Sequence, residues 1–204
     1  MANIVNVDYE AIPALARQVR SYAQDLNTEI VNAYTNIAEM HNFWYGVRYN
    51  ALVKEFNNII PQVNELLELV VGDIPYVLET IANNYAQADK GSTVTSAAKT
   101  APKKVTTLAM PGDVGMKFLT NEVTTMKSKV SNNFQNSKEK MISIEATCNK
   151  MQWQSEAAEA FKAKFAKLKN NIVASFENIE TQFAGLMAQT MQDVQATESA
   201  NTVG

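Results

Sequence analysis

Apolar residues recur every three or four positions through four long stretches of the chain, and this spacing constrains the fold more than any other feature. The stretches cover residues 12–40, 49–81, 119–151 and 158–186. A repeat close to 3.5 residues is typical of helices that bury one narrow face against neighbouring helices. The chain has only 7 glycines and 5 prolines among 204 residues, which favours helix over sheet. We therefore predict an all-α fold.

Short breaks divide the four helical stretches into two pairs. The first stretch ends at Asn42-Phe43-Trp44-Tyr45-Gly46, and the third ends at Trp153-Gln154-Ser155. Asn and Gly are common at helix ends, so the first break predicts the turn of a helical hairpin, and we expect a second turn where the third stretch ends. Each hairpin is thus expected to turn at a tryptophan.

Local signals also predict where helices begin and bend. Asp8 and Asp113 are the expected N-caps of the first and third helices, because a carboxylate accepts hydrogen bonds from free amides. Proline removes a backbone hydrogen bond and crowds the preceding turn. In the second helix we therefore expect one bend near Pro61 and another near Gly72 and Pro75.

The two hairpins align with each other at an offset of 109 residues, without a gap. The aligned pairs are Trp44 with Trp153, Leu52 with Phe161, Phe56 with Phe165, and Val63 with Ile172. This register predicts a duplicated unit, with one hairpin in residues 1–89 and another in residues 113–204. Residues 90–112 between them are small, polar or β-branched without a period, which is typical of a flexible linker.

The length of the linker carries information about how the hairpins pack. Neighbouring helices in a bundle need a loop of only about 2–8 residues. A helix of about 40 residues is roughly 60 Å long, and an extended linker of about 23 residues reaches roughly 75 Å. The linker can therefore run from one end of a bundle to the other. We predict two hairpins packed antiparallel as a four-helix bundle, an internal pseudo-dimer, although the same reach also allows a domain-swapped homodimer.

Three features resemble the WXG100 (ESAT-6-like) family, whose members are hairpins with Trp-x-Gly in the turn. Trp44-Tyr45-Gly46 matches that turn, while Trp153-Gln154-Ser155 matches it with serine in place of glycine. The run from Glu156 to Phe161 is similar to the family's sequence after the turn. Tyr85 and Asp89 match a Tyr-x-x-x-Asp/Glu signal that follows the second helix in the family, and the second hairpin lacks this tyrosine.

The resemblance implies a fused heterodimer of the kind exported by type VII (ESX-like) secretion systems. Its expected partners are the secretion ATPase and an effector toxin that it would accompany, and its expected location is outside the cell or at the cell surface. Residues 1–5 lack the basic and apolar regions of a Sec signal, which agrees with a Sec-independent route. Tyr85 and Asp89 are expected to lie beside Trp153, Gln154 and Ser155 as one composite export signal.

Alternatives exist for the residues of this signal. Trp44, Tyr45 and Gly46 would lie at the opposite end of the bundle, where Trp44 could equally be a hydrophobic staple of the turn. Tyr85 could be a last core residue of its helix. An intracellular helical adaptor and a membrane-active helical protein are the alternative functions, and the modest net charge of −3 gives membrane contact little support.

Composition argues against several other classes of function. The net charge of −3 does not predict a phosphate-binding surface for nucleic acid, and the lysines at positions 162, 164, 167 and 169 are expected to form a solvated face. His41 and Cys148 are the sole histidine and cysteine and lie in different hairpins, so we expect no metal site, no Cys/His dyad and no cofactor. Cys148 occupies a predicted core position and is expected to be an inert thiol. No catalytic constellation appears, and we predict that the protein is not an enzyme.

Overall fold

The computed structural model describes residues 7–95, 98–151 and 156–201, with the side chains of residues 156 and 157 left out, and it confirms the all-α prediction. Helix α1 (Ile12–Met40) is followed by a long helical arm made of α2 (Val47–Leu67), the π-helical segment η1 (Glu68–Asp73) and α3 (Ile74–Lys90). Helices α4 (Thr120–Lys150) and α5 (Glu156–Asn201) form the second hairpin. Two short strands, β1 (Trp44–Tyr45) and β2 (Lys117–Phe118), pair antiparallel.

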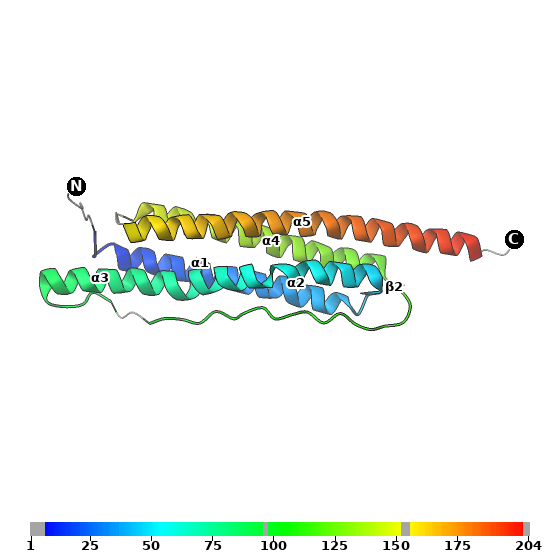
Figure 1. Ribbon diagram of the computed structural model, residues 1–204, viewed down its shortest axis with the longest axis horizontal. Helices are drawn as coiled ribbons and strands as arrows, with labels where there is room; N and C mark the ends of the chain where they lie inside the picture. The colour runs from blue at the N-terminus through cyan, green and yellow to red at the C-terminus, as the bar shows by residue number, and fades with distance from the viewer. Residues whose placement is uncertain (1–6, 96–97, 152–155, 202–204) are drawn as a thin grey trace.

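The hairpins lie antiparallel and side by side (Figure 1). The turn between α1 and α2 is at the end of the bundle where α4 begins, and α4 finishes near the end where α3 finishes. Helix α1 packs mainly on α4, and α2 packs mainly on α5. Most of the helix pairing therefore joins opposite hairpins. The linker returns along the outer side of the first hairpin, away from α4 and α5 (Figure 1).

An aromatic row crosses the middle of the bundle and includes one ring from each of four helices. The Tyr34 ring meets the edge of Phe56 at 5.3 Å, and Phe56 stacks on Phe134 at 5.7 Å between ring centroids. Phe134 and Phe176 are nearly parallel, with their centroids 4.0 Å apart. The Tyr34 hydroxyl donates a hydrogen bond to the Phe56 carbonyl, so its polar atom is satisfied although the side chain is buried.

The predicted irregularity in the second helical arm falls at one of the two expected places. Pro61 lies inside α2, which continues through it as α-helix. The π-helical segment η1 contains Gly72 and comes just before Pro75. A π-helical turn is a common way for a helix to absorb a break in its regular hydrogen bonding.

The two predicted N-caps differ from the structure in different ways. Asp8 accepts hydrogen bonds from the amides of Glu10 and Ala11 in the turn before α1, but the N-cap residue of the helix is Ala11. The prediction for Asp113 is wrong, because α4 begins only at Thr120. Between Asp113 and Thr120 the chain forms strand β2, which pairs with Trp44 and Tyr45. The Asp113 carboxylate instead lies 2.5 Å from the imidazole Nε2 of His41.

Helix α5 is longer than its buried stripe. After Thr190 every described side chain is at least partly exposed, and the helix projects beyond the bundle (Figure 1). None of the described helices has a stretch long and apolar enough to cross a membrane.

Candidate recognition end and linker groove

Trp44 is part of the core, not of the surface. Its side chain is 1% exposed. The indole stacks on Phe183 of α5 and meets the edges of Phe118 and Tyr49, at centroid distances of 6.0, 5.5 and 6.1 Å. A side chain this buried offers no contact area to a partner. The geometry therefore favours the staple alternative for Trp44, which fastens the turn to the second hairpin.

Gly46 is required by the backbone of the same turn. Its φ of 123° lies in a region that residues with a Cβ rarely adopt. A Cβ at this position would make only an ordinary contact with the carbonyl oxygen of Gly115, at 3.4 Å, so the requirement comes from the backbone conformation and not from a lack of space. Tyr45, which precedes it, pairs with Lys117 in the two-stranded sheet and is half-buried. The Trp-Tyr-Gly sequence thus closes the turn, and it pairs with strand β2, the segment just before α4.

Tyr85 and Asp89 lie at the other end of the bundle, one turn apart in the last part of α3. Residues four apart share a helix face. Tyr85 is 39% exposed, while the Asp89 carboxylate accepts a hydrogen bond from the Tyr9 hydroxyl. That bond raises the pKa of Tyr9, with smaller contributions from desolvation and from the charge of Asp89. Asp89 therefore has a partner within the chain, whereas Tyr85 presents its ring to solvent.

The segment before α1 holds this end of α3 in place. Lys90 forms an ion pair with Glu10, next to the bond between Tyr9 and Asp89. Helix α3 then ends at Gly91, which adopts the left-handed conformation with φ of 70°. Since two neighbouring side chains before α1 bind two neighbouring side chains of α3, the surface around Tyr85 has a fixed frame.

Trp153, Gln154 and Ser155 lie outside the described residues, so their predicted contact with Tyr85 stays a prediction. The helix ends that flank them, Lys150 and Glu156, are at the end of the bundle where α3 finishes (Figure 1). A groove of about 410 Å³ separates the second helical arm from the start of α5. Its apolar lining residues are Leu69, Ile74, Val77, Leu78, Ala160 and Phe161.

The linker, expected to be flexible, is bound in an extended form by asparagine side chains. Three of them lie on α2 at a spacing of seven residues: Asn50, Asn57 and Asn64. Asn64 donates to the Val105 carbonyl at 2.9 Å and accepts from the Val105 amide at 2.9 Å. Asn57 binds both backbone groups of Leu108 in the same way, at 3.0 and 2.8 Å.

The spacing of helix and linker matches at these contacts. Seven residues of α-helix rise about 10.5 Å, and three extended residues span roughly 10 Å. The linker therefore runs antiparallel to α2, and every third linker residue meets the next asparagine. The pairs are Val105 with Asn64, Leu108 with Asn57, and Pro111 with Asn50. We call these three asparagines the asparagine ladder.

The asparagine ladder is incomplete at its last position. Asn50 donates to the Pro111 carbonyl at 3.3 Å. Proline has no amide hydrogen to return, and the Asn50 Oδ1 is the one buried side-chain acceptor of the described residues that lacks a hydrogen-bond partner.

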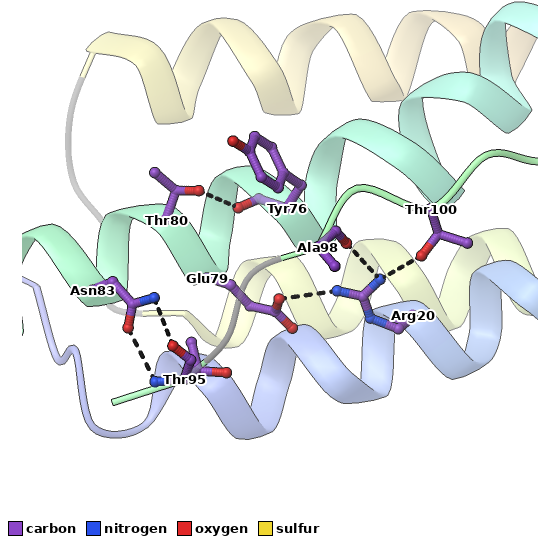
Figure 2. Close-up of polar contacts among 8 residues, drawn as sticks. All are labelled: Arg20, Tyr76, Glu79, Thr80, Asn83, Thr95, Ala98 and Thr100. Atoms are coloured by element: carbon purple, nitrogen blue, oxygen red, sulfur yellow. Dashed lines mark hydrogen bonds and ion pairs between the residues drawn. The ribbon is translucent and has the colours of Figure 1, made fainter. Parts of the chain in front are cut away.

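Two further asparagines extend the binding of the linker beyond α2. Asn27 of α1 pairs with both backbone groups of Lys103, at 2.7 and 2.8 Å. Asn83 of α3 pairs with both backbone groups of Thr95, and Figure 2 shows this contact. The described parts of the linker are thus bound near their beginning, middle and end.

A buried ion pair joins α1, α3 and the linker (Figure 2). The Arg20 guanidinium lies 3.0 Å from the carboxylate of Glu79, whose side chain is 5% exposed. The other guanidinium nitrogen donates to the Ala98 carbonyl and to the Thr100 hydroxyl. A buried carboxylate needs such a partner, because an unpaired charge there would be strongly destabilising.

The linker and the helix beneath it carry opposite charges. Lys99 pairs with Asp73 at 2.7 Å, and Lys104 pairs with Glu68 at 3.2 Å. Both acids belong to η1. Gly72, between them, lets the linker approach, since a Cβ there would meet the Thr100 carbonyl oxygen at 3.1 Å. The π-helical segment is therefore also the place where the linker crosses the helix closely.

Sequence reasoning missed this groove, although a signal for it was present. Asn50, Asn57 and Asn64 repeat every seven residues beside the apolar seam of α2. A heptad repeat of asparagine on a half-buried helix face indicates a polar partner that follows the helix for several turns. Apolar periodicity alone does not reveal such a repeat.

Two features of the described residues bear on chemistry: the arrangement of potential metal ligands and the environment of Cys148. No group of three His, Cys, Asp or Glu side chains in that part of the chain is arranged to hold a metal ion. Burial raises the pKa of the Cys148 thiol to about 12, an effect that nearby Lys162 opposes and Glu145 reinforces. A thiol with this pKa stays protonated near neutral pH and is a poor nucleophile.

Comparison with known proteins gives no relative: no protein-family model matches the chain, and neither the curated proteins nor the solved structures contain a match.

Proposed function

We propose that the protein acts by binding other proteins, as a substrate or co-exported partner of a type VII secretion system. The observation that carries the proposal is the position of Tyr85. It is a tyrosine 39% exposed in the last turns of α3, one turn before Asp89, on a helix end held by the segment before α1. An exposed aromatic ring on a rigid frame is well suited to anchor a partner, because little conformational freedom is lost on binding.

The two residues of the signal have different roles in this proposal. Tyr85 supplies the contact surface for the secretion ATPase. Asp89 holds Tyr9 and thereby the orientation of the helix end, and it is not a free ionic contact. Trp153, Gln154 and Ser155 complete the composite signal in this proposal. The export route is Sec-independent, and an effector toxin is the expected cargo of the co-exported form.

Export of variants from a host that has the secretion system tests the proposal. We expect Tyr85→Ala to abolish or strongly reduce the protein in the medium, and Trp153→Ala and Asp89→Ala to reduce it. Tyr76→Ala is a matched control, because Tyr76 is on the same helix and is also 39% exposed. Its export should be unchanged.

Two outcomes would contradict the proposal. Undiminished export of Tyr85→Ala, Asp89→Ala and Trp153→Ala would exclude the composite signal. Retention of the wild-type protein inside the cell would favour the intracellular adaptor instead. Far-UV circular dichroism of each purified variant checks that a loss of export does not reflect unfolding.

A further inference from the structure

The groove under the linker recognises a backbone more than a sequence. Four asparagines, Asn27, Asn57, Asn64 and Asn83, each bind both the amide and the carbonyl of one linker residue. Any residue except proline offers these two groups. Recognition of this kind therefore accepts many extended peptides, provided that they keep the three-residue register of the asparagine ladder.

Side chains of the linker add a small number of further requirements. Val105 is 5% exposed and packs against the core of the bundle, and Leu108 is half-buried. Thr106, Thr107, Ala109 and Met110 are exposed. The groove thus needs an aliphatic residue at one position, favours another three residues later, and leaves the rest unspecified.

The charges of the groove select the kind of peptide further. Glu68 and Asp73 lie where the bound segment carries Lys104 and Lys99. Negative charges at fixed positions favour a positively charged ligand, and they favour the chain direction that brings its positive charges beside them. The complementary ligand is an extended peptide that carries lysines at the positions of Lys99 and Lys104 and an aliphatic residue at the position of Val105.

We propose that this groove is a binding site for an extended, lysine-bearing peptide, and that the chain's own linker is its resident, displaceable ligand. The linker is tethered to the groove, and a short tether gives an effective concentration on the order of millimolar. A peptide from another protein binds when the linker leaves. This inference is independent of the proposed export function, because it uses neither Tyr85 nor Asp89.

Vacating the groove in the full-length chain makes the site testable. Val105→Asp places a carboxylate at a buried position and should release the linker. Lys99→Glu with Lys104→Glu removes both ion pairs and provides a second, independent way to release it. Hydrogen exchange at the amides of Lys103, Val105 and Leu108 reports release, because in the wild type these amides donate to asparagine side chains.

The binding assay uses a fluorescently labelled synthetic peptide with the sequence of residues 98–111. We expect saturable binding to the Val105→Asp protein and at least tenfold weaker binding to the wild type, where the linker competes. Adding Asn57→Ala and Asn64→Ala to the Val105→Asp protein should weaken binding at least tenfold. A peptide in which Lys99 and Lys104 are changed to glutamate, with Lys103 kept, should also bind at least tenfold more weakly.

Three results would overturn the proposal. The first is exchange of the three linker amides that stays slow in both release variants, since the linker would then be a fixed part of the fold. The second is a released linker without peptide binding. The third is binding that the ladder substitutions leave unchanged.

Discussion

The first hairpin is covered on two sides, and the two coverings rest on different chemistry. On one side α4 and α5 pack against it through apolar side chains, with the row of Tyr34, Phe56, Phe134 and Phe176 at the centre. On the other side the linker lies against it through backbone hydrogen bonds to asparagines and a few ion pairs. The first covering depends on the shape of each side chain, and the second depends mainly on the register of a backbone.

This difference predicts that the second hairpin contributes most to the stability of the fold, while the linker can be exchanged for another chain. Apolar burial is worth about 25 cal/mol per Å² and is lost steeply when a cavity forms. A hydrogen bond made on folding replaces one with water, so its net worth is only about 0.5–1.5 kcal/mol. The second hairpin is therefore expected to be a permanent partner of the first, whereas the linker is held by contacts that another extended chain can imitate.

The largest effect is expected from Phe134→Ala. Phe134 is fully buried and stacks on rings from both hairpins. Removing a buried phenyl ring leaves a cavity and typically costs about 3–5 kcal/mol. Urea unfolding followed by circular dichroism measures the change, and Ile142→Ala on the same helix is the control, because Ile142 is 59% exposed. A loss below about 1 kcal/mol for Phe134→Ala would mean that the aromatic row does not hold the hairpins together.

An intermediate effect is expected from Arg20→Met. This change leaves the Glu79 carboxylate buried without its partner, which we expect to lower the free energy of unfolding by about 3 kcal/mol. The double variant Arg20→Met with Glu79→Met removes both charges and should be more stable than the single variant. Urea unfolding of the four proteins of this cycle measures the coupling. A double variant less stable than Arg20→Met would show that burial of an unpaired charge is not the cause.

The smallest change in stability is expected from Pro111→Ala, which completes the asparagine ladder. The new amide can donate to the orphaned Oδ1 of Asn50, a gain of about 1 kcal/mol. Loss of the rigid proline ring in the unfolded chain offsets about 0.4–1 kcal/mol of it. The net stability should thus change by less than about 1 kcal/mol, while the amide at position 111 becomes protected from hydrogen exchange.

Pro102→Ala serves as the control for that measurement, since Pro102 is on the same linker, three residues before Val105, but the helix residue that would match it, seven positions after Asn64, is Val71 and not asparagine. Its new amide should exchange faster than the one at position 111. Equal exchange at the two positions would show that the Asn50 Oδ1 does not accept a hydrogen bond from the new amide at position 111.

Apolar periodicity predicted the helices well because burial of one face leaves a direct trace in the sequence. Residues such as Ile37, Phe134 and Ile172 lie at predicted core positions and are fully buried. The start of α4 could not be predicted from Asp113, because strand β2 forms only when the turn at Trp44 is present to pair with it. A contact between residues about 70 positions apart, such as Trp44 with Phe118, has no local signature.

In the candidate sites too, local motifs could be predicted from the sequence, whereas contacts between distant residues could not. The motif around Tyr85 and Asp89 was visible in the sequence, but the bond from Tyr9 to Asp89 was not, since it joins residues 80 positions apart. Composition predicted a flexible linker, whereas its described residues are bound in an extended form by asparagine side chains. Its ordering depends on asparagines of other helices, which composition of the linker does not reveal.

The bound linker also bears on the order in which the chain folds. The pairing of α1 with α4 joins residues such as Asn36 and Asn133, which are 97 positions apart. Between Lys90 and Thr120 lie 29 residues, but only 8 lie between Pro111 and Thr120. Once the linker has settled on the first hairpin, the entropy cost of bringing α4 into place falls by about 1 kcal/mol. The bound linker therefore places the start of α4 at the end of the first hairpin where the turn between α1 and α2 lies, and so favours antiparallel packing of the second hairpin.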